Sequence, residues 1–242
     1  MKQALKRRLC AHRGFARLFP ENSLSSVGAA LSLGARWVEI DVQMTRDGVP
    51  VVYHDTDLRR VSGRRGDIRN LSWAQASKLR VYEPGRLGNG FRSERLASLQ
   101  QMAHFFSGYK GAKLFVELKE ESLKRCGRLE MLAAVHEALK PLGAKRAVLI
   151  SFDEPVLGLA RQATRYELGY VLRQRRQLES DFYKRLKPEF VFSDIKGLPA
   201  KGSLKLRGAK QCLWEVPDPR QAEAAFERGI DMVETFALDH YL

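Results

Sequence analysis

Seven residues that can carry out acid–base, metal or phosphate chemistry stand in or next to short apolar runs: His12, Arg13, Glu39, Asp41, His54, Glu117 and Lys119. The runs are typical of buried β-strands, in which residues i and i+2 point to the same face. Glu39 therefore converges with Asp41, and Glu117 with Lys119. Three carboxylates in one place repel one another unless a cation neutralises them. Hard oxygen ligands favour Mg²⁺, Ca²⁺ or Mn²⁺ over zinc, so the pattern predicts a divalent-cation site.

The histidines and the basic residues extend the chemistry of that site. Two histidines near a metal can divide the work of general acid and general base. Arg13 and Lys119 suit an anionic group such as phosphate. The set predicts metal-assisted cleavage of a phosphodiester. Each part also has a structural interpretation, because strand-end histidines are often structural and because a solvated strand face would alternate in the same way as Glu39 and Asp41.

A hairpin would bring the second histidine to the first two carboxylates. The segment Thr45-Arg46-Asp47-Gly48 separates two apolar runs and is typical of a hairpin turn. A turn centred between its last two residues places Asp41 opposite His54. Cross-strand partners have Cβ atoms about 5 Å apart. His54 would then join the face that carries Glu39 and Asp41.

Short apolar runs alternate with helical patterns along the whole chain. The predicted strands are Leu9–His12, Trp37–Val42, Pro50–His54, Leu114–Leu118, Ala147–Phe152, Glu167–Leu172, Phe190–Ser193, Gln211–Val216 and Met232–Thr235. Amphipathic spacing predicts helices over Ser23–Leu33, Arg128–Leu142 and Gln221–Arg228. Glycines such as Gly34 and Gly229 precede strands, where they suit the left-handed residue that ends a helix.

This alternation predicts the fold class. If the hairpin accounts for one strand, eight strands remain parallel, and eight β/α units in 242 residues indicate a TIM-type (β/α)8 barrel. An open, doubly wound sheet is the alternative. In a barrel the active site lies at the carboxyl ends of the strands, where the seven residues stand. We expect residues 1–242 to form a single domain.

Residues 56–95 interrupt the alternation with 40 residues rich in Arg, Gly and Ser. A loop of this length inside a compact domain is usually functional or disordered. The segment carries ten Lys and Arg and four Asp and Glu, and the whole chain has a net charge of +14. Such a surface attracts nucleic acid, anionic membranes or phosphorylated small molecules.

Cysteine usage and hydropathy bear on the compartment. The three cysteines, Cys10, Cys126 and Cys212, are widely spaced and indicate neither a disulfide framework nor a zinc site. No apolar run approaches the roughly 18 residues of a membrane span, and the first residues hold too short an apolar stretch for a signal peptide. We therefore expect a cytoplasmic protein without a transmembrane segment.

The ordered motifs resemble the glycerophosphodiester phosphodiesterase family. The resemblance rests on His12-Arg13-Gly14, Pro20-Glu21-Asn22-Ser23, Glu39-Ile40-Asp41-Val42, Thr45-Arg46-Asp47-Gly48, Val51-Val52-Tyr53-His54-Asp55, Leu58-Arg59-Arg60-Val61-Ser62-Gly63 and Glu117-Leu118-Lys119. The match is dense over residues 11–66, thinner to Lys119, and rests beyond that on the strand–helix rhythm and on Trp214. The ordered set is far more specific than any one of its motifs.

The resemblance implies a TIM-type barrel, a divalent cation and hydrolysis of a glycerophosphodiester to an alcohol and glycerol 3-phosphate. It places the two catalytic histidines on His12 and His54, and the metal carboxylates on Glu39, Asp41 and Glu117. Arg13 and Lys119 match the family's phosphate-contacting residues. The family's insertion after the second histidine falls on residues 56–95, which we expect near the active-site mouth. The implied partner is a small-molecule glycerophosphodiester.

Three late or intervening motifs depart from the family's pattern. The family often has Trp-Thr-Val-Asn where this chain has Trp214-Glu215-Val216-Pro217, and it ends differently from Met232-Val233-Glu234-Thr235-Phe236. Leu96-Ala97-Ser98-Leu99 replaces an Ile-Pro-Thr-Leu element. These changes leave every matched catalytic residue in place, but they alter the late-strand wall and therefore bear on the substrate. Trp214 is expected to contact the glycerol or the leaving group, or else to belong to the core.

Three other functions remain open at this stage. The same chemistry could act on lysophospholipids or sphingolipid-type phosphodiesters, which would need an apolar groove at the mouth. A basic nucleic-acid-binding protein would explain the charge, although the aligned carboxylates would repel a phosphate backbone. A barrel that has lost its activity would not need all five histidine and carboxylate positions. The sequence does not indicate the oligomeric state.

Overall fold

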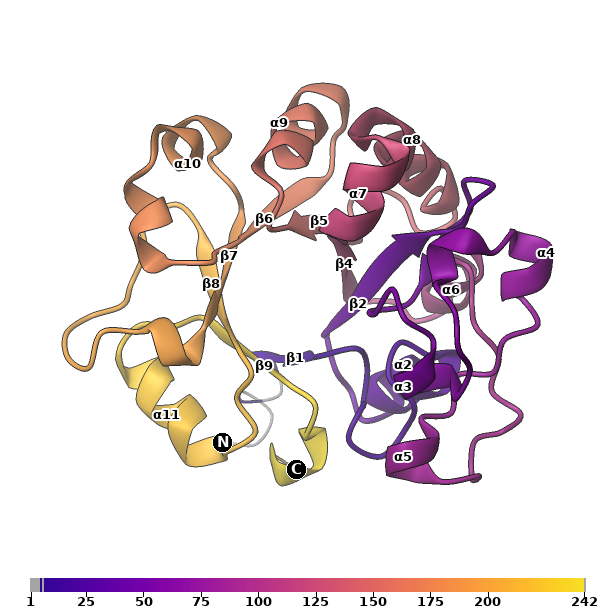
Figure 1. The fold of residues 1–242 in the computed structure, drawn as a ribbon. Helices are drawn as coiled ribbons and strands as arrows, with labels where there is room; N and C mark the ends of the chain where they lie inside the picture. The colour runs from indigo at the N-terminus through magenta and orange to yellow at the C-terminus, as the bar shows by residue number, and fades with distance from the viewer. Residues whose placement is uncertain (1–4, 6, 242) are drawn as a thin grey trace.

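A closed barrel of parallel strands forms the centre of the molecule (Figure 1). This computed structural model describes residue 5 and residues 7–241. The parallel strands are β1 (Leu9–Ala11), β2 (Trp37–Met44), β4 (Lys113–Leu118), β5 (Ala147–Ser151), β6 (Glu167–Val171), β7 (Phe190–Asp194), β8 (Lys210–Trp214) and β9 (Met232–Thr235). They pair in the order β1-β9-β8-β7-β6-β5-β4-β2, and β1 pairs again with β2. The pairing of β1 with β2 closes the sheet, which confirms the barrel and excludes the open sheet.

The two faces of the strands build separate apolar layers. Residues such as Val38 and Ile40 of β2 are fully buried between the strands and the surrounding helices. The opposite face fills the barrel interior with residues such as Phe115, Phe192 and Met232. All nine predicted strands are confirmed, and their ends shift by at most two residues. They were predictable because strands that are covered on both faces need near-continuous apolar runs.

Helices form a ring outside the barrel (Figure 1). They are α2 (Leu24–Ser32), α6 (Leu99–Ser107), α7 (Glu120–Cys126), α8 (Arg128–Ala138), α9 (Glu154–Ala163), α10 (Asp181–Leu186) and α11 (Pro219–Glu227), with short 3-10 turns η2 (Arg175–Glu179), η3 (Ile195–Gly197) and η4 (Leu238–Tyr241). Two of these helices have an aspartate N-cap, because Asp153 accepts a hydrogen bond from Val156 N at the start of α9 and Asp218 accepts one from Arg220 N at the start of α11. Gly34 and Gly229 have φ values of 86° and 97°, which explains the glycines that end α2 and α11.

The β2–β3 hairpin forms, but its predicted register is wrong. Strand β3 (Pro50–Val52) runs antiparallel to β2 with Val42 opposite Val52, and the Tyr53 amide donates to the Asp41 carbonyl at 3.0 Å. Asp41 therefore lies opposite Tyr53 rather than His54. The predicted turn is centred between Asp47 and Gly48, whereas the observed register centres it on Asp47. Gly48 allows this, because it adopts a φ of 81° and its amide donates to Thr45 O.

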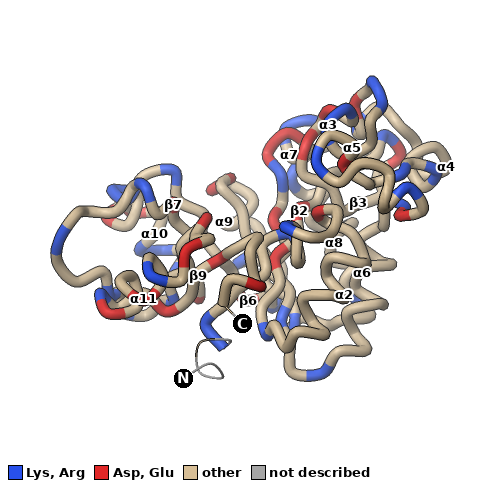
Figure 2. The backbone as a smooth tube through the Cα atoms, turned by 90° about the horizontal axis from the view of Figure 1, so that it is seen from below, with Lys and Arg blue, Asp and Glu red and all other residues tan. Residues whose placement is uncertain are grey.

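Residues 56–95 have a small core of their own. They contain α3 (Arg59–Ser62), η1 (Ile68–Asn70), α4 (Trp73–Ala76) and α5 (Pro84–Leu87). Leu58, Val61 and Ile68 are buried against Val51 and Tyr53 of the hairpin arm. Figure 2 shows many Lys and Arg positions along these helices and the loops between them. The segment is therefore a structured, basic attachment to β3 rather than a disordered loop.

The described residues contain no helix that is both long enough and apolar enough to cross a membrane. Cys10 and Cys212 are buried free thiols, as expected, whereas Cys126 is only half-buried.

Candidate active site

The inner faces of β2, β4 and β9 change from apolar to acidic toward their carboxyl ends. Phe115 and Met232 belong to the interior apolar cluster, and the next inward residues on their strands are Glu117 and Glu234. On β2, Asp41 is the register partner of Glu117. The carboxylates of Glu39, Asp41 and Glu117 each offer an oxygen within 4.8 Å of the others. The two neighbouring strands thus bring the three predicted metal ligands together.

Burial and mutual repulsion shape the charges of this cluster. Burial, and then the neighbouring Asp41, raise the pKa of Glu39 well above its usual range. Burial also opposes ionisation of Asp41, but Arg13 and Lys119 outweigh it and lower the pKa of Asp41. One oxygen of Glu39, Oε1, is buried without a hydrogen-bond partner among the described residues. An unsatisfied buried carboxylate oxygen beside two more carboxylates fits a cation ligand.

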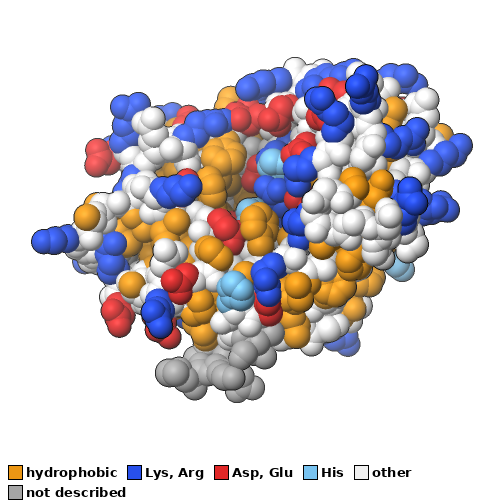
Figure 3. All heavy atoms as spheres, turned by 60° about the horizontal axis from the view of Figure 1, so that its bottom comes forward, with side chains coloured by type: hydrophobic (Ala, Val, Ile, Leu, Met, Phe, Trp, Pro, Cys, Tyr) orange, Lys and Arg blue, Asp and Glu red, His pale blue; other side chains and the backbone are white. Residues whose placement is uncertain are grey.

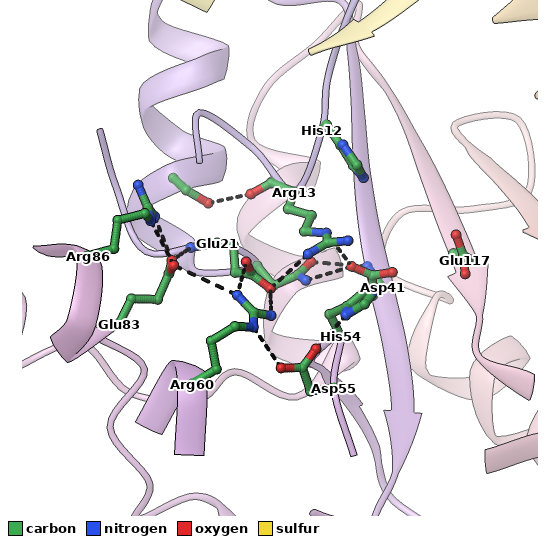
Figure 4. Close-up of polar contacts among 12 residues, drawn as sticks. His12, Arg13, Glu21, Asp41, His54, Asp55, Arg60, Glu83, Arg86 and Glu117 are labelled. Carbon is green, nitrogen blue, oxygen red and sulfur yellow. Dashed lines mark hydrogen bonds and ion pairs between the residues drawn. The ribbon is translucent and has the colours of Figure 1, made fainter. Parts of the chain in front are cut away.

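Arg13 and Lys119 both pair with the carboxylates, and Figure 4 shows Arg13 beside Asp41. Arg13 Nε lies 3.0 Å from Asp41 Oδ2. Lys119 Nζ lies 2.9 Å from Glu117 Oε1 and 3.3 Å from Asp41 Oδ1. Arg13 holds this position in a left-handed backbone conformation, with a φ of 54°. Such strain is common at functional sites, where the surroundings hold the backbone in place.

His12 follows β1 and is held by two carboxylates and one aromatic ring. Its Nδ1 lies 2.8 Å from Glu215 Oε2, and its Nε2 lies 3.9 Å from Glu39 Oε2. The imidazole stacks on Phe236 with ring centres 4.3 Å apart and an interplanar angle of 6°. Burial works against the imidazolium, but Glu234 and Glu215 outweigh it and raise the pKa of His12.

His54 follows β3 and is anchored through its own neighbour. Its Nδ1 lies 2.6 Å from Asp55 Oδ1, and Asp55 Oδ2 accepts a hydrogen bond from Arg60 Nε at 2.7 Å. The His54 carbonyl accepts a hydrogen bond from the side-chain Nε2 of Gln43 at 2.9 Å. These contacts carry the ring to the carboxylate cluster although the strand register differs from the predicted one.

The seven residues named first and Trp214 surround or adjoin one cavity. Its volume is about 150 Å³, and its lining is His12, Arg13, Glu39, His54, Glu117, Lys119, Ile150, Phe152, Val171, Phe192, Trp214 and Glu234. Figure 3 shows a histidine in a hollow of this face, between acidic and basic side chains. The wall opposite the carboxylates is apolar, and Trp214 Nε1 is buried there without a partner among the described residues.

Several residues that shape the site were not predicted as site residues. Asn22 donates to Asp41 Oδ2 at 2.8 Å and accepts from the Asp41 amide at 3.0 Å. Its position inside the Pro20–Ser23 motif was the available signal. Glu215 and Glu234 stand in the two late motifs that depart from the family pattern, and both lie against His12. Asp55 had a signal too, because it directly follows His54 within a motif.

The comparisons with known proteins match most of this chain. The model of the "Glycerophosphoryl diester phosphodiesterase family" matches residues 12–235. "Glycerophosphodiester phosphodiesterase" of Caldanaerobacter subterraneus subsp. tengcongensis is 28% identical over 240 residues, which cover 96% of this chain and 94% of that protein. The structure of an Oleispira antarctica phosphodiesterase in complex with the product sn-glycerol-3-phosphate superimposes with a TM-score of 0.82, at 26% identity, over 95% of this chain and 93% of that one.

A mammalian relative matches a shorter part of the chain. "Glycerophosphodiester phosphodiesterase 1" of Rattus norvegicus is 38% identical over 91 residues. The alignment covers 38% of this chain and spans little more than a quarter, 28%, of the rat protein.

Proposed function

Because the chain belongs to the glycerophosphoryl diester phosphodiesterase family, we propose that it hydrolyses glycerophosphodiesters to an alcohol and sn-glycerol 3-phosphate. The observation that carries this proposal is the convergence of His12, His54 and the three carboxylates on one cavity at the carboxyl end of the barrel. The whole-chain match to a bacterial relative of that name supports it, as does the likeness to the product complex. The expected substrates are small deacylated phospholipid head-group esters.

We propose that Glu39, Asp41 and Glu117 hold a divalent cation, Mg²⁺, Ca²⁺ or Mn²⁺. Their hard oxygens and the unsatisfied Glu39 Oε1 support this assignment. The cation would neutralise charge on the phosphoryl oxygens as the phosphorus is attacked.

Two-histidine catalysis is the mechanism that the geometry supports. A glycerol hydroxyl of the substrate attacks the phosphorus of the same molecule, and one histidine accepts the hydroxyl proton. The other histidine gives a proton to the departing alcohol as the phosphorus–oxygen bond to that alcohol breaks. A cyclic phosphate results, and water then opens it with the histidines in exchanged roles, which yields glycerol 3-phosphate.

The basic and aromatic residues position the reacting group in this proposal. Arg13 and Lys119 face the same cavity as the histidines, and their charges suit the phosphoryl oxygens. Trp214 lines the apolar wall, where its free Nε1 can donate to a hydroxyl of the glycerol or the leaving group.

The test is the release of glycerol 3-phosphate from glycerophosphocholine and glycerophosphoethanolamine, measured with Mg²⁺, Ca²⁺, Mn²⁺ or EDTA. We expect metal-dependent release that His12→Ala lowers by at least about 100-fold. His104→Ala is the matched control, because His104 is an exposed histidine on α6, away from the cavity. Folded protein that releases no product with any cation would contradict the proposal.

The lysophospholipid alternative needs an apolar groove that leads outward from the centre. The larger cavity beside the centre is lined by four arginines and two glutamates, with only Ala16, Leu87 and Phe236 apolar, so we favour small polar substrates. The acidic residues around the phosphate-binding groups likewise argue against a nucleic-acid backbone.

We also propose that residues 1–242 form one domain, with residues 56–95 near the mouth, and that the protein acts in the cytoplasm, which its free thiols support.

A further inference from the structure

We propose that a second cavity, next to the catalytic one, binds the leaving alcohol and selects an alcohol that carries a phosphate. This inference rests on the proposed function, because it names the substrate class of the same site. The second cavity, here called the outer cavity, has a volume of about 450 Å³ and is lined by Arg13, Ala16, Arg17, Glu21, Arg60, Glu83, Arg86, Leu87 and Phe236.

The outer cavity adjoins the reacting centre. Arg13 lines both cavities, and Phe236 lines the outer cavity while its ring stacks on His12. A phosphodiester has two arms on its phosphorus, whereas the catalytic cavity of about 150 Å³ is small. With the phosphoryl group between the histidines and Arg13, one arm therefore extends past His12 and Phe236 into the outer cavity.

The carboxylates of the outer cavity are already paired with guanidinium groups, which neutralise their charge. Glu21 is buried and accepts from Arg13 Nη1 at 3.1 Å and from Arg60 Nη1 and Nη2 at 2.6 and 2.7 Å. Glu83 is buried and accepts from the Glu21 amide at 2.7 Å and from Arg86 Nη2 and Nε at 2.6 and 2.8 Å. Figure 4 shows both carboxylates enclosed by these guanidinium groups. A quaternary ammonium group would meet cations here rather than carboxylates.

The guanidinium groups, in contrast, keep donors free. Each guanidinium carries five N–H groups. Within the described residues, Arg17 uses only Nε and Nη2, both on Asp239, so both N–H groups of its Nη1 remain available. Arg60 uses one N–H on each of its three nitrogens, which leaves two among the described contacts. Arg86 uses four of its five, on Glu83, Arg17 O and Phe19 O. The side chains of Arg17, Arg60 and Arg86 are 45%, 44% and 39% exposed, so a ligand can reach them.

Spare N–H donors beside carboxylates that are already neutralised define the ligand that fits. Charge-assisted hydrogen bonds from several guanidinium groups suit phosphate oxygens better than hydroxyl groups. Phe236 is a single aromatic face, and Arg13 already lies over it at 5.6 Å, so the cavity lacks an open aromatic surface for choline. The geometry thus favours a phosphorylated alcohol as the leaving group.

The experiment compares substrates that share the glycerophosphoryl half and differ in the alcohol. Glycerophosphoinositol 4-phosphate, glycerophosphoinositol and glycerophosphocholine are assayed at one fixed ionic strength. We expect kcat/KM for the phosphorylated alcohol to exceed that for glycerophosphocholine by about tenfold or more. Equal rates on all three substrates, or a preference for glycerophosphocholine, would overturn the proposal.

Variants separate local recognition from overall charge. Arg17→Gln is expected to raise KM for the phosphorylated substrate by about fivefold to tenfold and to raise KM for glycerophosphocholine by much less, with Arg17→Lys in between. Arg64→Gln removes the same charge from an exposed residue outside the lining, and it should preserve the preference. An equal loss on all substrates in Arg17→Gln would contradict the assignment, and unfolding temperatures check that the variants are folded.

A binding arm keeps this inference distinct from the proposed function. Inositol 4-phosphate, inositol and choline are titrated calorimetrically into the wild-type protein and into Arg17→Gln. Tighter binding of inositol 4-phosphate that Arg17→Gln weakens would support the outer cavity as an anion site even if no substrate were cleaved. Absence of that binding in an active enzyme would refute the inference and leave the proposed function intact.

Discussion

Each imidazole of the site is paired through Nδ1 with a carboxylate, but the two carboxylates are held differently. Asp55 also accepts a hydrogen bond from Arg60. Glu215 has no such partner among the described residues and instead accepts a hydrogen bond from the Phe236 backbone N–H at 2.9 Å, besides its contact with His12. Glu215 therefore fixes both the imidazole and the backbone of the ring that stacks on it. An Nδ1 proton donated to Glu215 leaves Nε2 to face the reacting group. We infer that Glu215 is a positioning residue for His12.

Replacing Glu215 with threonine should lower kcat by at least about tenfold, because His12 loses its orientation and its charge partner. KM should change little, since Arg13 and Lys119 remain in place. Glu215→Gln, which keeps one hydrogen-bond acceptor, should fall between the two. Steady-state kinetics on one substrate measures both constants, and an unchanged kcat in folded Glu215→Thr would contradict the positioning role.

In the absence of added cation, Glu234 should make the free energy of unfolding depend on pH. Burial raises its pKa to about 7, although His12 counteracts this, so the folded state favours the protonated form. The stabilisation is complete below the unfolded pKa near 4.5 and is lost as the pH rises through about 7. In EDTA, the wild-type unfolding temperature should therefore decline more between pH 5 and 7.5 than that of Glu234→Gln. Parallel curves for the two proteins would contradict this prediction.

At the scale of elements, short caps and turns position much larger pieces. Asp153 ends the loop after β5, caps α9 through Val156 N at 2.8 Å, and pairs with Arg128 Nε at 2.8 Å. It thereby ties the start of α9 to the start of α8. A buried carboxylate with these contacts stabilises two neighbouring β/α units at once.

Asp153→Ala should lower the free energy of unfolding by about 1–2 kcal/mol, which is the usual cost of a lost N-cap. Asp153→Ser should recover part of this loss because serine also caps helices. Urea denaturation of the three proteins measures the difference. If the alanine variant were as stable as the wild type, the cap would have no energetic role.

The sequence predicted these elements well where one rule decides the structure. Buried parallel strands need apolar runs, and the left-handed residue after a helix favours glycine, so the nine strands and the glycines after α2 and α11 were predictable. The hairpin register was not, because one residue with positive φ at Gly48 moves the turn centre. The helices of residues 56–95 are too short to show periodicity. Glu215 is 203 residues from His12, so no local pattern could reveal their contact.

At the scale of the whole molecule, charge is distributed unevenly. The chain has a net charge of +14, and residues 56–95 carry ten Lys and Arg, most of them in the loops between the short helices (Figure 2). The reacting centre itself is acidic at its base and basic at its rim. Long-range attraction therefore adds to local recognition when an anionic substrate approaches.

Raising the ionic strength from about 0.01 M to about 0.15 M should lower kcat/KM for an anionic substrate, because screening shortens the reach of the basic surface. The value of kcat should stay constant, since the bound substrate is sheltered. Arg64→Gln should weaken the salt dependence slightly. A salt-independent kcat/KM would show that steering contributes nothing to capture.

The pairing of β1 with β9 has a consequence for when the candidate site forms during synthesis of the chain. His12 lies just past a three-residue strand and is synthesised 203 residues before Glu215, which directly follows β8, whereas Glu234 belongs to β9. The His12 imidazole therefore lacks both of these carboxylate neighbours until synthesis has passed residue 234. A growing chain therefore builds most of its barrel before the candidate site exists, and the site is complete only when β9 pairs with β1.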